Sequence, residues 1–211
     1  MSAASFFFGN ILTIDIVMLS FRGYYIILGV MSLKAAVLYR SKTGFTKKYA
    51  EWIAEDLSIE AHNLDEVRNL SELLQGKDTL VFGGGLYAIG INGLKKLLAD
   101  ESMRDIRNVF VFCTGLSLGS DDVKREIYEN NIKGVEKLNV KLYYYRGGFD
   151  FRKLNLMDKL LMRLLKLKIE MKKKRSPLAS DELGMLAVFN RQVDFTDREL
   201  TRKLVQDVQS C

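Results

Sequence analysis

The amino-acid sequence predicts one α/β domain built on a doubly wound, five-stranded parallel β-sheet. Three observations carry this prediction. From Leu33 onward, segments of strand length alternate with segments of helical periodicity. The strand segments are almost continuously apolar, which is typical of parallel strands covered on both faces. The chain has 211 residues, 48% of them hydrophobic, which is enough for one domain with a sizeable core.

The elements follow one another in regular order. Strands are expected at Leu33–Tyr39, Ile59–Leu64, Thr79–Phe82, Asn108–Phe112 and Val140–Tyr145. Helices are expected at Thr43–Leu57, Leu70–Leu74, Gly93–Ala99, Asp121–Asn130, Asn155–Lys174 and Thr196–Val208. Ser120 or Asp121 suits the N-cap of the fourth helix, and Thr196 with Glu199 forms a capping box for the last. Ligands of such sheets bind at the carboxyl ends of the strands, so a site is expected in the loops that follow them.

The first 30 residues differ in composition from the rest of the chain. Phe, Ile, Leu and Tyr dominate there, and Asp15 and Arg22 are the only charged residues. A secretory signal is disfavoured, because no basic start or small-residue cleavage site is evident. A transmembrane helix would place Asp15 or Arg22 in the bilayer at a cost of about 2.5–3.5 kcal/mol. We favour translation from Met31, with the domain at residues 31–211, and keep a membrane anchor at residues 1–30 as the alternative.

The charge of the chain is concentrated in one segment. Ten of the 32 Lys and Arg residues, but only two of the 26 Asp and Glu residues, lie between Arg152 and Arg175. This segment therefore carries +8 and the rest of the chain −2, within a net charge of +6. The two cysteines, Cys113 and Cys211, form no disulfide framework and no CxxC motif, which fits a reducing, cytoplasmic compartment.

The loop after the first strand has the composition of a phosphate site. It reads Ser41-Lys42-Thr43-Gly44-Phe45-Thr46, with three hydroxyls, one glycine and no acidic residue, directly before a helix. A phosphate is held by backbone N–H groups, hydroxyl donors and the positive end of a helix dipole, and this loop offers all three. Elsewhere in a chain, such a turn would be read as an ordinary Ser/Thr cap.

Other nucleotide and phosphate sites fit the sequence less well. The dinucleotide motif GxGxxG is absent after the first strand, and no GxxxxGK[ST] loop occurs in the chain. A phosphoacceptor domain of the same architecture needs an aspartate after the third strand, where this chain has Gly83, Gly84 and Gly85. No Ser-His-Asp or metal-ligand constellation stands out, and His62, Cys113 and Trp52 read as structural residues.

The loop resembles the phosphate loop of flavodoxins, [S/T]-x-T-G-x-T. More closely, the run Val37-Leu38-Tyr39-Arg40-Ser41-Lys42-Thr43-Gly44-Phe45-Thr46, together with Ala50-Glu51-Trp52-Ile53-Ala54, resembles the flavodoxin-domain family that includes menaquinone-dependent protoporphyrinogen dehydrogenase. Gly147-Gly148-Phe149 and the run Leu156-Met157-Asp158-Lys159-Leu160-Leu161-Met162 are similar to that family's segment after the fifth strand. The resemblance spans residues 33–208 and implies a flavodoxin-like fold with strand order 2-1-3-4-5. A basic helical insertion at about residues 147–192 precedes the last helix.

The resemblance also implies FMN as the cofactor. Ser41, Lys42, Thr43, Gly44, Phe45 and Thr46 would surround its phosphate, while Gly84, Gly85, Leu86, Tyr87, Thr114, Gly115 and Leu116 would frame its ring. Tyr87 is read either as a ring-stacking residue or as a surface tyrosine. The second ring loop lacks an aromatic residue, unlike that of many small electron-carrier flavodoxins, which leaves one face of the ring open to a substrate.

The helix within Arg152–Arg175 is basic and amphipathic, and it has two interpretations. It binds an anionic membrane surface or an acidic partner, or it is a surface helix whose apolar face belongs to the core. Nucleic acid is not expected, because no stacking aromatics alternate with the charges.

Taken together, these features favour an FMN-dependent oxidoreductase similar to protoporphyrinogen dehydrogenase. It would pass electrons to a quinone or another redox partner and would be cytoplasmic or peripheral on the inner face of the membrane. Two alternatives remain open: an electron carrier without a substrate of its own, and a flavin-free module that binds a membrane or a partner through the basic helix.

Overall fold

The structure is a computed structural model that describes residues 3–8, 12–21, 24–87, 89–135, 138–154, 156–178, 186–189 and 191–211, with side chains from Leu33 onward. The strands are β1 Ala3–Phe8, β2 Leu12–Phe21, β3 Tyr24–Leu33, β4 Ala35–Arg40, β5 Ala61–Asn63, β6 Thr79–Tyr87, β7 Gly90–Ile91, β8 Asn108–Gly115, β9 Asn139–Arg146, β10 Gly148–Phe149 and β11 Val193–Asp194. The helices are α1 Phe45–Asp56, α2 Leu70–Leu74, α3 Leu94–Leu98, α4 Asp121–Asn131, α5 Leu156–Lys173 and α7 Arg202–Gln209. Short 3₁₀ helices occupy Glu101–Met103, Phe151–Lys153 and Arg198–Thr201.

The main sheet has the expected parallel order. Its strands run β5-β4-β6-β8-β9, which is 2-1-3-4-5 when these five are counted along the chain. All four pairings are parallel, and the central strands pair over long registers such as Ala35 with Thr79 and Thr79 with Asn108. The doubly wound fold is therefore confirmed.

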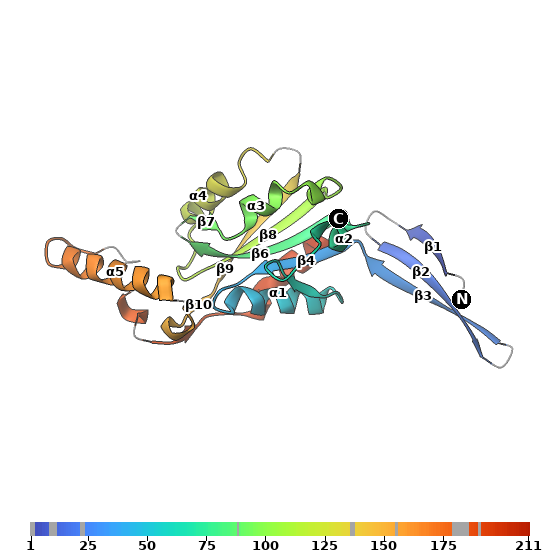
Figure 1. Cartoon of the computed structure of the whole chain (residues 1–211), viewed down its shortest axis with the longest axis horizontal. Coiled ribbons are helices and arrows are strands. Elements are labelled where there is room, and N and C mark those ends of the chain that lie inside the picture. Colours follow the sequence, from blue (N-terminus) through green and yellow to red (C-terminus); the bar gives the residue numbers. More distant parts are fainter. Residues whose placement is uncertain are drawn as a thin grey trace.

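Helices cover the sheet on both faces, as Figure 1 shows for α1 on one face and for α3 and α4 on the other. The first face buries Tyr49 and Ile53 of α1 with Leu204 and Val208 of α7. The second face buries side chains of α2, α3 and α4, among them Ile127. The near-continuous apolar strands follow from this arrangement, because each central strand has a core on either side.

Two expected strand ends are corrected by the structure. The third and fourth strands do not stop at Phe82 and Phe112 but continue to Tyr87 and Gly115, so most of the expected ring-framing residues are strand residues. Strand β6 continues because β7 pairs back onto its end as an antiparallel hairpin. Pairing with β9 in turn extends β8 as far as Gly115.

The last helix begins later than its capping pattern predicted. Asp197, whose side chain accepts a hydrogen bond from the Glu199 N–H at 2.9 Å, caps the 3₁₀ turn at Arg198–Thr201, and α7 follows at Arg202. The Thr196 hydroxyl donates to Asp194 instead, so the Thr196–Glu199 capping box was wrong. At α4 the Ser120 cap is confirmed by its bond with the Val123 N–H.

The basic insertion is delimited by a short strand pair. Gly148 and Phe149 of β10 pair antiparallel with Asp194 and Val193 of β11, which brings the two ends of the insertion together beside the sheet. Its main element is α5, which extends from one end of the molecule (Figure 1). Among the apolar residues of α5 only Ile169 is buried, so the apolar face of this helix does not belong to the core.

Before the main sheet the chain forms a separate three-stranded antiparallel sheet, β1-β2-β3. Met31 lies within β3, opposite Ile14 of β2. Figure 1 shows this sheet at the end of the molecule opposite α5. Among the described residues, no helix has both the length and the apolar character needed to cross a membrane. Translation from Met31 stays a prediction.

Candidate functional site

The loop that joins β4 to α1 presents free backbone donors at the carboxyl edge of the sheet. Gly44 adopts φ +93°, a left-handed conformation that side chains rarely allow, and it is the N-cap of α1 without a side-chain cap of its own. In the described part of the chain, the N–H groups of Phe45, Thr46 and Lys47 have no acceptor, and no acidic residue lies in the first turn. These N–H groups and the helix dipole together attract an anion.

Two hydroxyls of the loop are held in place and one is free. Ser41 Oγ accepts the Gly44 N–H at 3.1 Å and fixes the turn. Thr46 Oγ1 lies 2.7 Å from Thr114 Oγ1, and both side chains are buried. The Thr43 hydroxyl has no hydrogen-bond partner among the described residues. Each hydroxyl has one proton to donate. Ser41 only accepts here and keeps its proton for a further oxygen, and Thr46 does the same when Thr114 is the donor in their shared bond.

Lys42 does not extend along the phosphate loop but reaches the insertion. Its Nζ binds Asp158 of α5 at 2.9 Å and lies 4.6 Å from the centre of the Tyr87 ring. Burial disfavours the charged lysine, but the hydrogen bonds and charge interactions with Asp158 and Tyr87 together outweigh it, so the pKa of Lys42 is raised. Burial raises the pKa of Tyr87, while the nearby positive charge of Lys42 acts to lower it. The loop, strand β6 and the insertion thus meet at one cluster.

Phe45 faces the interior rather than the loop opening. Its ring is buried, and a side chain on Gly148 of β10 would collide with it. Phe45 therefore contributes only its backbone N–H to the phosphate loop, while its side chain fixes the start of the insertion.

The glycines at the strand ends are required by the protein's own packing. A Cβ on Gly84 would collide with Ile91 of β7, and one on Gly115 would collide with Tyr144. Gly85 differs, because a Cβ there would only touch Thr46 Oγ1 at 3.7 Å and the Tyr87 ring at 3.6 Å. The Gly85 position therefore leaves a backbone surface open beside the phosphate loop.

Sequence reasoning missed Asn131, which anchors the hairpin that carries Tyr87. Asn131 is buried at the end of α4, where its Oδ1 accepts the Ile91 N–H at 2.9 Å. Its Nδ2 donates to the carbonyls of Ile89 at 2.6 Å and Ile127 at 2.8 Å. Only the tertiary structure places α4 beside this hairpin, so no local pattern in the sequence indicated this role.

The loop after β8 forms the other side of the site. The Leu116 carbonyl accepts from Arg146 Nε at 3.3 Å, and the Gly115 carbonyl accepts the Gly147 N–H at 2.7 Å. Leu118 is 84% exposed. The loop contains no aromatic residue, so Tyr87, itself 42% exposed, is the aromatic residue that the two ring loops supply.

The expected site residues therefore come together at one edge of the sheet. The chain matches a family model described as flavodoxin domain over residues 36–176. The chain belongs to the flavodoxin-domain family. Membership of this family supports FMN as the cofactor. A search of curated proteins gave no match.

Solved structures of flavodoxins resemble the chain at low identity. A flavodoxin from the domain Archaea is 16% identical, with 54% of this chain and 84% of that chain covered at a TM-score of 0.38. A flavodoxin, WrbA-like protein from Agrobacterium tumefaciens is 14% identical, with 83% and 97% covered at 0.43. A flavoprotein in complex with FMN from Lactobacillus acidophilus NCFM is 21% identical, with 53% and 91% covered at 0.35. The family assignment rests on the family model and not on these structures.

The phosphate end of an FMN fits the residues of this flavodoxin domain. The free N–H groups of α1, the free Thr43 hydroxyl and the absence of an acid from the first turn are the features that a phosphate dianion requires. Gly85 of β6 and Thr114 of β8 pair with each other at the same edge of the sheet. Gly85 has no side chain, so a flat ring can approach its backbone.

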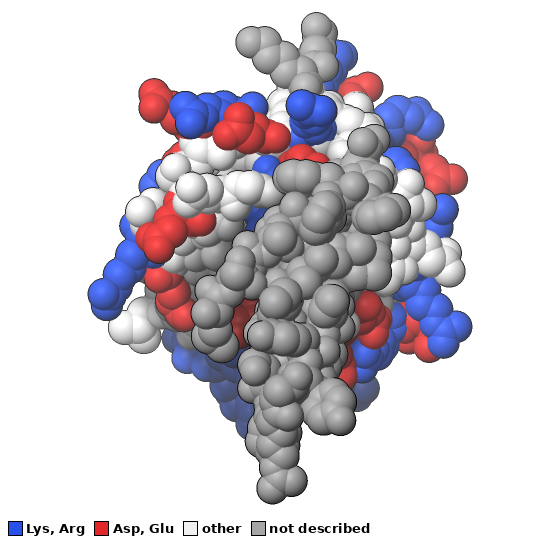
Figure 2. Space-filling model, turned by 90° about the vertical axis from the view of Figure 1, so that its right-hand side faces the viewer, with Lys and Arg blue, Asp and Glu red and all other residues white. Residues whose placement is uncertain are grey.

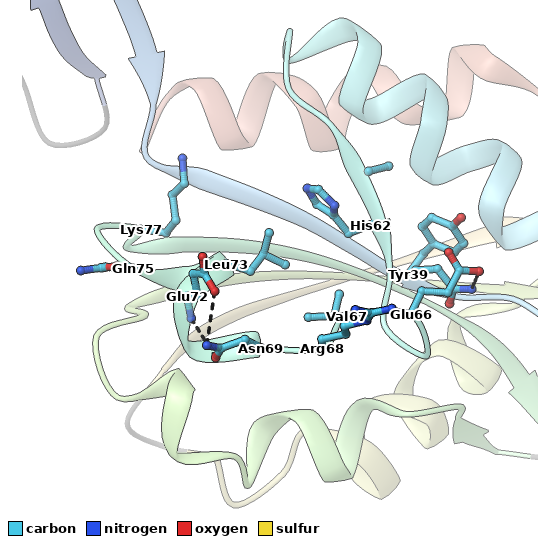
Figure 3. Close-up of a pocket in the computed structure, with 12 residues that line it drawn as sticks. Tyr39, His62, Glu66, Val67, Arg68, Asn69, Glu72, Leu73, Gln75 and Lys77 are labelled. Atoms are coloured by element: carbon cyan, nitrogen blue, oxygen red, sulfur yellow. Dashed lines mark hydrogen bonds between the residues drawn. The ribbon is translucent and has the colours of Figure 1, made fainter.

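Other polar features of the domain lie away from this edge. A cavity of about 740 Å³ beside β5 and α2 is lined by His62, Glu66 and Arg68, and Figure 3 shows Asn69 and Glu72 bonded to each other at its side. None of the phosphate-loop residues lines it.

Cys113 is fully buried and Trp52 packs on the core, as expected for structural residues. Among the described residues, no cluster of His, Cys, Asp or Glu could hold a metal.

Proposed function

We propose that this flavodoxin-domain protein is an FMN-dependent oxidoreductase similar to the menaquinone-dependent protoporphyrinogen dehydrogenases. It passes electrons from a reduced substrate to a quinone or another acceptor. The observation that carries the proposal is the row of free N–H groups at Phe45, Thr46 and Lys47, with the free Thr43 hydroxyl beside it. Bound FMN would supply the redox chemistry, because a flavin exchanges one or two electrons at a time.

The role of the chain's own residues is to bind the cofactor and position it. The loop residues Ser41, Thr43, Gly44 and Thr46 hold the phosphate, and the strand ends at Gly85 and Thr114 frame the ring. Thr46 links the two parts, because its hydroxyl contacts that of Thr114. Oxidation of the substrate is balanced by reduction of the quinone to its quinol.

A substrate-using enzyme is favoured over a plain electron carrier by two features. Only Tyr87 supplies an aromatic ring to the ring loops, which leaves room for a substrate on the other side. The insertion also reaches the site through the Lys42–Asp158 ion pair, so an additional element borders the site opening. A small carrier has no need of either feature.

FMN binding is tested on the full chain with purified protein. FMN is added, excess is removed by gel filtration, and the visible flavin bands are read against protein concentration, with affinity measured by calorimetry. We expect retained flavin at about one per chain and a loss of affinity of at least about tenfold in the Thr43→Ala, Thr46→Ala double variant. Ser210→Ala, whose hydroxyl donates to the Asp207 carbonyl at the C-terminal end of α7, serves as the control. Folded protein without retained flavin would overturn the proposal.

The reaction is tested separately on the flavin-loaded protein. Porphyrinogen and a soluble menaquinone analogue are supplied together, and porphyrin formation is followed by its fluorescence. Steady turnover that depends on the quinone supports the dehydrogenase. Flavin-bound protein that fails to turn over, yet passes electrons from a reductase to cytochrome c, is an electron carrier instead.

A further inference from the structure

Helix α5 exposes a continuous apolar stripe. At 3.6 residues per turn, six apolar side chains fall within about 100° of the helix circumference. They are Leu156, Met157, Leu160, Leu164, Leu167 and Met171, and all are more than half exposed, from 53% at Leu160 to 85% at Leu156. An exposed stripe of this length is unusual for a soluble surface, where contiguous apolar patches mark interaction sites.

Basic side chains border this stripe on both sides. Lys159 and Arg163 follow one edge in the helical order, and Lys168 lies beyond the other. Asp158, the acidic residue of the first turn, pairs instead with Lys42 of the phosphate loop. A helix with an apolar stripe between two basic edges matches the layering of a bilayer surface, with acyl chains below and anionic headgroups beside it.

A basic cavity lies at the foot of the same helix. It has a volume of about 630 Å³ and is lined by Arg152, Arg163 and Arg191 together with the rings of Phe151 and Phe189. Arg152 is paired with Asp150 at 3.1 Å, whereas Arg163 and Arg191 have no carboxylate partner among the described residues. Since Arg163 borders both the stripe and the cavity, a phosphate headgroup bound there would lie next to the inserted apolar side chains.

The described side chains at the end of the molecule opposite α5 do not share this charge pattern. Figure 2 views the molecule from the end opposite α5, and acidic and basic side chains are interspersed around its described rim. The segment from Arg152 to Arg175 carries +8, while the rest of the chain carries −2. A second copy of the chain on the stripe would bring two such segments together, and their repulsion opposes a dimer.

We propose that α5 is an interfacial helix that docks the protein on an anionic lipid bilayer. The apolar stripe enters the boundary between headgroups and acyl chains, and Lys159, Arg163 and Lys168 contact lipid phosphates. Because α5 begins beside the phosphate loop, docking places the redox site near the membrane, where quinones dissolve. The docking itself does not depend on FMN, so it stands or falls separately from the proposed reaction.

Vesicle sedimentation of the full chain tests this proposal. Wild-type protein is mixed with vesicles of phosphatidylcholine and phosphatidylglycerol in equal parts, or of phosphatidylcholine alone, at low and high salt. We expect binding at least about tenfold tighter to the anionic vesicles, weakened by salt. Equal binding to both vesicles, or no binding to either, would overturn the proposal.

Substitutions on α5 test whether this helix, rather than another part of the surface, binds the vesicles. The Leu160→Glu, Leu164→Glu variant is expected to lose at least about tenfold in vesicle affinity, and the milder Leu160→Ala, Leu164→Ala variant to lose less. Tyr128→Glu with Leu200→Glu, two side chains of similar exposure elsewhere on the surface, is the matched control and should bind normally. Unchanged binding of both leucine variants would contradict the assignment. So would a wild-type dimer in gel filtration that the glutamate variant turns into a monomer.

Discussion

Thr46 and Thr114 are 68 residues apart in the chain, yet their hydroxyl oxygens lie 2.7 Å apart in a buried contact. The bond joins the first turn of α1 to the end of β8, and so connects the expected phosphate end of the site to its ring end. Thr46 therefore has two roles: its side chain makes this contact, and its backbone N–H is one of the free donors of the loop.

We expect Thr114→Val to lower the free energy of unfolding by about 1–2 kcal/mol, because the buried Thr46 hydroxyl loses its partner. FMN affinity should fall by a few-fold, since Thr46 is no longer fixed. Urea unfolding and flavin titration measure the two effects. Thr114→Ser keeps the hydroxyl and should restore most of both, and equal damage from the two substitutions would point to lost packing instead.

Asn131 should control the order of the Tyr87 hairpin. Asn131→Leu leaves the Ile91 N–H and the Ile89 carbonyl without partners, and we expect a loss of about 1–3 kcal/mol in unfolding free energy. Amide hydrogen exchange should quicken at residues 86–92 more than in the central strands. The adjacent Asn130→Ala, which removes an exposed bond to the Glu126 carbonyl, is the control and should leave the hairpin unaffected.

Loss of the hydroxyl is expected to lower stability at only one of two tyrosines on β9. The Tyr145 hydroxyl is buried without a hydrogen-bond partner in the described part of the chain, whereas the Tyr143 hydroxyl donates to Asp207 at 2.6 Å. Tyr145→Phe should therefore leave stability unchanged or raise it by about 1 kcal/mol, and Tyr143→Phe should lower it by a similar amount. Thermal unfolding of the two variants side by side decides the matter, and a destabilising Tyr145→Phe would reveal a partner for that hydroxyl.

Asp207 should make stability fall at acidic pH. The hydrogen bond from Tyr143, followed by that from Lys203, lowers the pKa of Asp207. Its contribution is therefore complete above the ordinary carboxyl pKa and is lost as the pH falls through the lowered value. In Tyr143→Phe the pKa of Asp207 should rise toward its usual range, as read by carboxyl NMR titration. An unchanged pKa would show that Lys203 and Lys141 hold the carboxylate charge without the tyrosine.

The two thiols should differ in reactivity. Burial raises the pKa of Cys113 to about 12, so at neutral pH this residue is a protonated, inaccessible thiol. Cys211 is only partly buried, although burial raises its pKa as well. A thiol reagent at mildly alkaline pH should label Cys211 in the native protein and both residues after unfolding. Labelling of Cys113 in the native protein would mean that the sheet opens at β8.

By itself, the sequence determined the alternation of strands and helices, the hydroxyl-rich loop at Ser41–Thr46 before the first helix and the basic segment at Arg152–Arg175. These features are local, because apolar runs, helical periods and the spacing of hydroxyls are patterns among residues that are close together in the chain. The flavodoxin-like strand order came from resemblance rather than from periodicity, because alternation alone leaves the order of parallel strands open.

Only the tertiary structure decided how far the strands run and which distant residues meet. Strand β6 reaches Tyr87 because β7 folds back onto it, and the last helix begins at Arg202 because Asp197 caps the turn before it. Asn131 and the Thr46–Thr114 contact depend on elements far apart in the chain. The same limit applies to α5: its periodicity fits a core helix as well as an interfacial one, and only packing against the rest of the chain leaves its apolar stripe exposed.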